Sequence, residues 1–384
     1  MRIRLLVLVF LFGLSAKAQE RIVFESGKEG HAIYRIPAII SLPNNDLLAF
    51  AEGRVNGTDD FGDINLVMKR STDDGKSWSE IQTLIDYDSL QAGNPAPVVD
   101  LHNPDFPDGV IYLFYNTGNN HEYEVRTGNG VREIWMIKSF DMGETWGAPV
   151  NITSQTHRPN QPEFNSEYNF EEDWRHYANT PGHAFQFQKG KFKGRIYIPA
   201  NHSKGEINAK GEDYFAHGYY TDDHGETFHL SESVDIPGSN ESIAAELPDS
   251  RMIMSIRNQK GDIRQRIIAY SEDGGVSWSE EYFDNSLVDP VCQGSILSFE
   301  NEGGKTILAH SNNDHPSLRN NLTLKFSYDL GRTWKNPRVV DFNHSLQGGS
   351  WTAYSDLVYL GENKLGILYE KNDYQQIVFR AIQF

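Results

Sequence analysis

An eight-residue pattern repeats five times along the chain and constrains its fold more than any other feature. The first copy, STDDGKSW at residues 71–78, has the form S-x-D-x-G-x-x-W. The aspartate can accept backbone N–H bonds in a tight turn, the glycine can take a positive φ angle, and the aromatic ring can pack the turn onto its neighbours. The pattern returns at residues 139–146, 221–228, 271–278 and 327–334, with Phe228 in place of Trp in the third copy. Each octet predicts a hairpin turn, and five copies indicate a repeat architecture.

Short apolar runs joined by turn residues surround the octets. Residues 36–42 and 46–52 flank Pro43-Asn44-Asn45, and residues 241–247 and 251–258 flank Pro248-Asp249. Such runs, bounded by Pro, Asn and Asp, are typical of β-strands. No segment shows a helical period over three turns. We therefore expect an all-β chain, with further strands at residues 110–115, 133–139, 195–200, 306–310, 322–327, 357–360 and 365–370.

The spacing of the octets predicts a β-propeller. Their starts are 68, 82, 50 and 56 residues apart, and a four-stranded blade takes roughly 40–50 residues. We predict six blades of four antiparallel strands, the last closed by strands from both chain ends, with seven blades as the alternative. A double-sheet sandwich is disfavoured because it gives no reason for a repeated turn. Residues 155–180 form an insertion that either covers one face of the propeller or is mobile.

The N-terminus has the pattern of a secretory signal peptide. A basic start, MRIR, is followed by the apolar run at residues 5–14 and by Ala16-Lys17-Ala18, which is typical of a cleavage site. The apolar run is too short to span a bilayer. We therefore expect residues 1–18 to be removed and residues 19–384 to form one exported propeller domain, in the periplasm or outside the cell.

Composition excludes several functional classes. The formal net charge is −18, so the overall field of the protein does not favour nucleic acid or an anionic membrane, and an anionic ligand would need a local arginine cluster. Cys292 stands alone, which excludes an internal disulfide. The sequence has neither an H-E-x-x-H motif, nor a repeated calcium-loop spacing, nor a glycine-rich phosphate loop. We expect a monomer without metal or cofactor.

Three arginines and the repeated octet together carry a family resemblance. Arg35 lies in Tyr34-Arg35-Ile36-Pro37, Arg257 ends an apolar run, and Arg319 precedes a strand that leads into the last octet. Each arginine alone is most often a surface ion pair. The YRIP motif combined with several S-x-D-x-G-x-x-W turns resembles the exo-sialidase (neuraminidase) family of propeller glycoside hydrolases. The resemblance covers residues 22–384.

The resemblance implies a substrate-binding arginine triad. Arg35, Arg257 and Arg319 match the family's three arginines, and guanidinium groups bind carboxylates through paired, permanently charged hydrogen bonds. A sialoside carries such a carboxylate on its anomeric carbon. Glu370 matches the glutamate that steadies the first arginine, and Arg54 matches a further arginine that lines the family's pocket near the sugar.

The resemblance also implies three catalytic residues. Asp60 precedes an aromatic-Gly-Asp sequence, which selects it as the acid/base over Asp59 and Asp63.

Tyr354 matches the family's nucleophile. Its competitor Tyr359 lies five positions along the same strand, on the other face. A phenol avoids the like-charge repulsion, roughly 4 kcal/mol at 4 Å, that a carboxylate nucleophile would meet. Because the reference pKa of tyrosine is about 10, a base is needed, and Glu241 is placed to serve.

The resemblance predicts an exo-α-sialidase that hydrolyses terminal sialic acids with retention. Its partners would be sialylated glycoproteins, glycolipids or oligosaccharides. One alternative is a non-catalytic, sialoside-binding propeller lectin, which would not need Asp60, Glu241 and Tyr354 together. A second alternative is a trans-sialidase, which would use the same residues.

Overall fold

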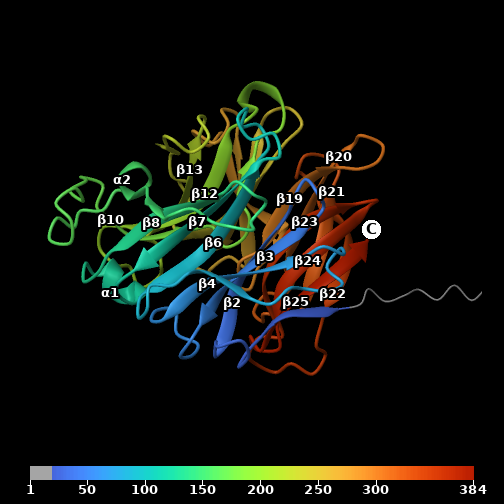
Figure 1. The fold of residues 1–384 in the computed structure, drawn as a ribbon, viewed down its shortest axis with the longest axis horizontal. Helices are drawn as coiled ribbons and strands as arrows, with labels where there is room; N and C mark the ends of the chain where they lie inside the picture. The colour runs from blue at the N-terminus through green and yellow to red at the C-terminus, as the bar shows by residue number, and fades with distance from the viewer. Residues whose placement is uncertain (1–19) are drawn as a thin grey trace, which may run out of the picture.

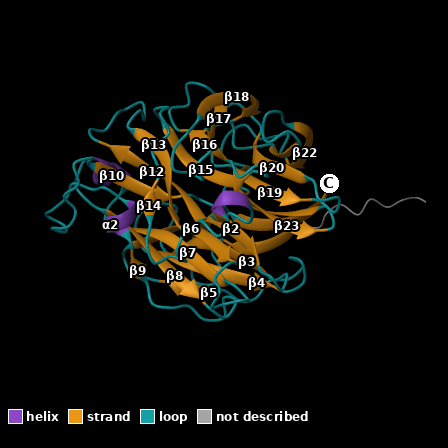
Figure 2. Cartoon of the chain, turned by 90° about the horizontal axis from the view of Figure 1, so that it is seen from above, coloured by secondary structure: helices purple, strands orange, loops and turns teal. Residues whose placement is uncertain are grey.

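The computed structural model describes residues 20–384 and shows an all-β propeller (Figure 1). The predicted signal peptide, residues 1–18, lies outside the described residues. Figure 2 shows strands spread around a central region. Near the middle of the view are β2 (Ile33–Ser41), β6 (Gln91–Asp100), β15 (Ser239–Glu246), β19 (Ser295–Glu300) and β23 (Thr352–Gly361). Strand β2 packs beside β6 and β23, and β19 packs beside β15 and β23. These five strands therefore line the propeller axis.

Four sheets contain four or five strands each. One joins β1 (Arg21–Glu25), β25 (Gln376–Gln383), β24 (Lys364–Lys371) and β23 (Thr352–Gly361). The second joins β10 (Trp174–Asn179), β12 (Ile196–Lys204), β13 (Tyr214–Thr221) and β14 (His229–Leu230), with β11 (Phe185–Gln186) beside β12. The third joins β15 (Ser239–Glu246), β16 (Met252–Asn258), β17 (Gln265–Ser271) and β18 (Glu280–Val288). The fourth joins β19 (Ser295–Glu300), β20 (Thr306–Asn313), β21 (Leu322–Ser327) and β22 (Lys335–Asp341).

The remaining sheet has eight strands. Its order is β2 (Ile33–Ser41), β3 (Leu47–Arg54), β4 (Ile64–Ser71), β6 (Gln91–Asp100), β7 (Val110–Gly118), β8 (Arg132–Ser139) and β9 (Val150–Asn151), and β5 (Gln82–Ile85) also pairs with β4. Short helices α1 (Glu122–Arg126) and α2 (Thr153–Thr156) and a 3₁₀ turn (Gly190–Phe192) lie in the connections.

The prediction of six blades with four antiparallel strands each is wrong. The described strands form four separate blade-like sheets and one eight-stranded sheet. A parallel pairing of Ile64 in β4 with Gln91 in β6 joins what the octet spacing divides into two units. The alternative of seven blades fails for the same reason. Octet spacing counts turns along the chain, whereas this pairing depends on how closely two strands approach in space.

Each octet is the turn between an antiparallel strand pair, as predicted. In the first copy, between β4 and β5, the Ser71 hydroxyl donates to Asp73 at 2.8 Å and accepts the Gly75 N–H at 2.9 Å. Asp73 also accepts the N–H and the hydroxyl of Ser77, at 2.8 and 2.6 Å. All five copies place a Ser or Thr in this seventh position, which the sequence pattern left open: Ser77, Thr145, Thr227, Ser277 and Thr333.

The octets also join neighbouring sheets. Gly75 has a φ angle of +80°, and a Cβ atom there would collide with the Phe379 ring of β25. Trp78 packs edge-on against the same ring, with 5.6 Å between the centroids. The core between these two sheets consists of side chains from β1 to β4 and β23 to β25, Phe24, Ile39 and Leu368 among them.

Both chain ends contribute to one sheet, as predicted, because β1 pairs with β25. The predicted insertion at residues 155–180 is only partly an insertion. It contains an isolated bridge between Asn160 and Asn169, but residues 174–179 form strand β10 and pair with β12. No helix among residues 20–384 is long and apolar enough to cross a membrane.

Candidate active site

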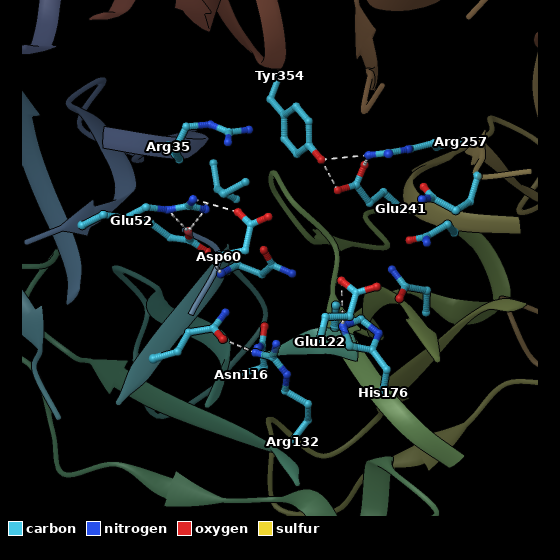
Figure 3. Close-up of a pocket in the computed structure, with 18 of the residues that line it drawn as sticks. Arg35, Glu52, Asp60, Asn116, Glu122, Arg132, His176, Glu241, Arg257 and Tyr354 are labelled. Atoms are coloured by element: carbon cyan, nitrogen blue, oxygen red, sulfur yellow. Dashed lines mark hydrogen bonds and ion pairs between the residues drawn. The ribbon is translucent and has the colours of Figure 1, made fainter. Parts of the chain in front are cut away.

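A polar pocket of about 280 Å³ lies among the propeller's inner strands (Figure 3). It contains every residue that the sequence predicted for the site except Glu370, which is buried behind Arg35. The predicted residues come from β2, β3, the loop after β3, β15, β16, the loop before β21, and β23. They lie far apart in the sequence, and the convergence of the sheets brings them together.

Arg35 is fixed in place by Glu370. Its Nε donates to Glu370 Oε1 at 2.7 Å, and the carboxylate is fully buried. The same carboxylate accepts the backbone N–H groups of Ile36, at 2.9 Å, and Tyr354, at 3.1 Å. Burial acts to lower the pKa of Arg35, but the Glu370 charge outweighs it and the pKa is raised. Glu370 thus ties the first arginine to the strand that carries Tyr354.

The other two arginines also face Tyr354. Arg257 Nη1 donates to Glu241 Oε2 at 2.6 Å and to the Tyr354 hydroxyl oxygen at 2.9 Å. The guanidinium carbons of Arg319 and Arg35 lie 5.6 and 5.5 Å from the centre of the Tyr354 ring. Arg319 is held by the Tyr374 hydroxyl at 3.0 Å and by a backbone carbonyl. Three permanent positive charges therefore surround one phenol.

Tyr354 is paired with Glu241 through its hydroxyl, which donates to Glu241 Oε1 (Figure 3). Burial raises the pKa of Tyr354 well above its ordinary value, and the Glu241 charge raises it further, while Arg257 and Arg319 oppose both effects. The phenol is therefore protonated at rest and needs a base to become a nucleophile. Tyr359, at the other end of β23, instead stacks on Phe299 with 4.6 Å between the ring centroids.

Asp60 lies on the loop between β3 and β4, with a side chain that is 77% exposed. Its Oδ1 pairs with Arg54 Nη1 at 2.7 Å, and Arg54 also pairs with Glu52 at 2.7 Å. Partial burial acts to raise the pKa of Asp60, but the charges of Arg54 and Arg35 outweigh it, and the pKa is lowered. Asp60 is thus ionised at neutral pH in the free protein.

The sequence prediction missed one side of the pocket. Asn116 of β7, Glu122 of α1, Arg132 of β8 and His176 of β10 also line it. No repeated motif marks these four residues. In the structure, Gly118 of β7 pairs with Gln91 of β6 on one side and with Arg132 of β8 on the other. In the sequence, Gly118 is the one residue that could have pointed to this side of the pocket, and a lone glycine is a weak signal. Among residues 20–384, no group of three or more His, Cys, Asp or Glu side chains is arranged to hold a metal ion.

The chain is similar to known proteins over most of its length. Residues 45–367 match the BNR repeat-like domain, which makes the chain a BNR-repeat propeller. It is 30% identical to a sialidase of Micromonospora viridifaciens over 367 residues, covering 90% of this chain and 51% of that protein. It is 28% identical to an exo-alpha-sialidase of Arthroderma benhamiae, covering 90% of this chain and 80% of that protein. The chain belongs to the sialidase family.

Solved structures agree in fold. The Hadza microbial sialidase Hz136 superposes with a TM-score of 0.79 at 23% identity, covering 95% of this chain and 68% of that chain. A leech intramolecular trans-sialidase superposes with a TM-score of 0.74 at 17% identity, covering 96% of this chain and 70% of that chain. The chain spans about half the length of the Micromonospora relative and about four fifths of the Arthroderma relative.

Proposed function

We propose that this protein is an exo-α-sialidase, a retaining glycoside hydrolase that releases terminal sialic acids from glycoproteins, glycolipids or oligosaccharides. The observation that carries the proposal is the convergence of Arg35, Arg257 and Arg319 on Tyr354, whose hydroxyl donates to Glu241. Three guanidinium groups offer a site for the substrate carboxylate. With the carboxylate bound there, the adjoining anomeric carbon would lie within reach of the Tyr354 oxygen, which is paired with Glu241 as its base.

In the first step, the Tyr354 oxygen attacks the anomeric carbon and its proton passes to Glu241. The glycosidic bond breaks, and the leaving oxygen takes a proton from Asp60. In the second step, Asp60 takes a proton from water, and the water oxygen attacks the same carbon. The bond to Tyr354 breaks, and the phenol recovers its proton from Glu241. Two displacements at one carbon give net retention.

Asp60 must gain a proton before the first step, because Arg54 keeps it ionised in the free protein. Substrate binding supplies a physical cause. The bound carboxylate adds negative charge beside Arg35, and the sugar excludes water from the exposed Asp60 side chain. Both changes favour the neutral carboxylic acid.

The presence of a paired base favours hydrolysis over simple binding. A lectin needs the arginines, but it has no use for a tyrosine whose hydroxyl donates to a glutamate. Transfer of sialic acid to a sugar acceptor would use the same residues, so the product decides between hydrolysis and transfer.

The experiment is a time course of 3′-sialyllactose with the protein, followed by ¹H NMR. We expect free sialic acid, first as the α-anomer and then equilibrating to the β-anomer. A first product with β configuration would contradict retention, and a 2,7-anhydro product or a new sialoside would contradict hydrolysis. Binding of the trisaccharide without any product would support the lectin alternative.

We also propose that residues 1–18 direct export and are removed, leaving residues 19–384 as one propeller domain. The basic start, apolar run and Ala16-Lys17-Ala18 support this. Intact mass spectrometry of the protein recovered from the periplasm or medium should give a chain that begins at Gln19. A protein retained in the cytoplasm with Met1 intact would contradict the proposal.

A further inference from the structure

The pocket wall opposite Tyr354 is made of charged and polar side chains. Figure 3 shows Arg132, Glu122 and His176 on the side of the pocket away from the Tyr354 ring, with Asn116 beside Arg132. We call Asn116, Glu122, Arg132 and His176 the far wall. Among the described residues that line the pocket, the only aliphatic ones are Ile36 and Ala178. Ile36 packs with Tyr354, so Ala178 is the only aliphatic residue available near the far wall.

Arg132 is built into this wall rather than left on a surface. It is 3% exposed, and its Nη1 donates to Gln91 Oε1 by crossing over Gly118, which stands between the two in the sheet. A Cβ atom on Gly118 would lie 2.7 Å from Arg132 Nη1. Arg132 Nε and Asn116 Oδ1 are buried with no hydrogen-bond partner among the described residues. The backbone thus makes room for a buried cation at the pocket.

Glu122 and His176 complete the far wall. Glu122 Oε1 accepts a bond from the Tyr214 hydroxyl, and Oε2 lies 3.7 Å from His176 Nε2. His176 is buried, and its Nδ1 has no partner among the described residues. The far wall therefore offers a cation, a carboxylate and an imidazole within one surface, and can both donate hydrogen bonds to a ligand and accept them.

The shape of a pyranose ring determines which substituent meets this wall. If the anomeric carbon, C2, lies at Tyr354 with its carboxylate on the arginines, then C5 lies across the six-membered ring from C2. The substituent on C5 therefore points towards the far wall. A hydroxyl there can accept from Arg132 and donate to Glu122. An acetamido methyl would instead remove these charged groups from water without giving them a hydrogen bond, which is unfavourable.

We propose that the far wall selects sialic acids that present a hydroxyl on the C5 substituent over those that present an acetamido methyl. The hydroxyl can be carried by C5 itself or by an N-glycolyl group. The inference rests on the proposed function only for the orientation of the sugar. Arg132 is the main specificity-determining residue, and Glu122 supplies the acceptor.

The test combines turnover and binding. Three 4-methylumbelliferyl α-glycosides are compared, with 5-hydroxy, 5-N-glycolyl or 5-N-acetyl substituents. Their kcat/KM values are measured with the wild-type protein, and their Kd values with Tyr354→Phe by calorimetry. At least one hydroxyl-bearing glycoside should exceed the acetamido glycoside by about tenfold or more in both measurements. Which of the two is preferred identifies the source of the hydroxyl.

The outcomes separate this inference from the proposed function. Equal or better binding and turnover of the acetamido glycoside overturns the inference and leaves the sialidase assignment standing. Hydroxyl-selective binding without any turnover by the wild-type protein supports the inference and overturns the hydrolase assignment. Absence of binding by all three glycosides overturns both.

Variants assign the preference to the far wall. Arg132→Met should reduce the hydroxyl-to-acetamido ratio of kcat/KM by about tenfold. Glu122→Gln, a change of the same shape on a partly exposed side chain, should reduce it in the same direction even if Arg132→Met folds poorly. Arg195→Met is the matched control. Arg195 precedes β12 and pairs with Asp222, at the end of this strand away from the pocket, and it does not line the pocket. An unchanged ratio in both pocket variants would overturn the inference.

Discussion

Asp60 shows how one residue's surroundings in the free protein differ from those that its proposed role requires. It is mostly exposed and ionised beside Arg54, yet the proposed first step needs it as an acid. Protonation by a general acid contributes more to the rate when the leaving oxygen is more basic. An aryl oxide can leave without protonation, whereas a sugar alkoxide cannot.

Asp60→Asn should therefore discriminate between leaving groups. We expect it to lower kcat/KM on 3′-sialyllactose by about 10²–10⁴-fold and to lower the first step on an activated aryl sialoside far less. Single-turnover release of the aryl alcohol isolates that first step. Equal losses on both substrates would show that Asp60 does not protonate the leaving group.

At the residue scale, the sequence predicted the side of the pocket that is proposed to bind the carboxylate, but not the far wall. Arg35 and Glu241 could be found because they lie in local motifs beside turns and strand ends. Arg132 could not, because its importance comes from crossing Gly118 to reach Gln91 on a third strand. That arrangement depends on strand register, which no local pattern in this chain specifies.

At the scale of elements, strands β10, β12 and β13 carry a buried histidine cluster. His202 of β12 lies 3.1 Å from His217 of β13, Nδ1 to Nδ1, and stacks on Trp174 of β10 with 3.6 Å between the ring centroids. His157 packs on Tyr177 of β10. Burial lowers the pKa of all three histidines, that of His217 to about 3.

This cluster should make the protein less stable in acid. Below pH 6.5 the histidines of the unfolded chain bind protons, whereas the buried imidazoles of the folded protein stay neutral. The free energy of unfolding therefore falls as the pH falls towards the folded-state pKa. The loss between pH 7 and pH 5 is roughly 2 kcal/mol per histidine. His217→Gln should therefore lose less Tm than wild type over this range, and His229→Gln, which changes an exposed histidine, should match wild type. Equal losses in all three proteins would show that the buried histidines do not cause the loss of stability in acid.

The octet shows how far a local motif predicts an element. Asp73 and Gly75 have the predicted roles in the turn, because these roles depend on neighbours within eight residues. Trp78 packs the turn onto a neighbouring sheet, at Phe379 of β25. The Ser77 hydroxyl was missed, although every copy has Ser or Thr there.

At the scale of the whole molecule, the chain closes on itself through β1. Phe24 is fully buried between β1 and the neighbouring strands, next to Tyr34 at 5.2 Å between ring centroids. Glu20 adds ion pairs to Lys371 and Arg380 at 2.8 and 2.6 Å. The joining of β4 to β6, by contrast, is a lateral contact that the repeat spacing could not reveal.

Phe24→Ala should weaken this closure by about 3–5 kcal/mol, the usual cost of removing a buried phenylalanine side chain. Ile22→Ala is the control on the same strand, because Ile22 is 47% exposed and its loss should change stability by less than about 0.5 kcal/mol. Denaturant unfolding measures both. Equal effects of the two changes would show that β1 does not hold the propeller closed.

Tyrosine-dependent sialoside cleavage is tested most directly by comparing wild type with Tyr354→Phe on an aryl α-sialoside and following release of the fluorescent alcohol. The wild-type protein should release it, and Tyr354→Phe, which removes one hydroxyl beside Glu241, should lose at least about a hundredfold in turnover. Tyr359→Phe, the same change on β23 outside this pocket, should keep wild-type turnover. Near-normal turnover by Tyr354→Phe would contradict a tyrosine nucleophile, and absence of release by the wild-type protein would contradict the sialidase assignment.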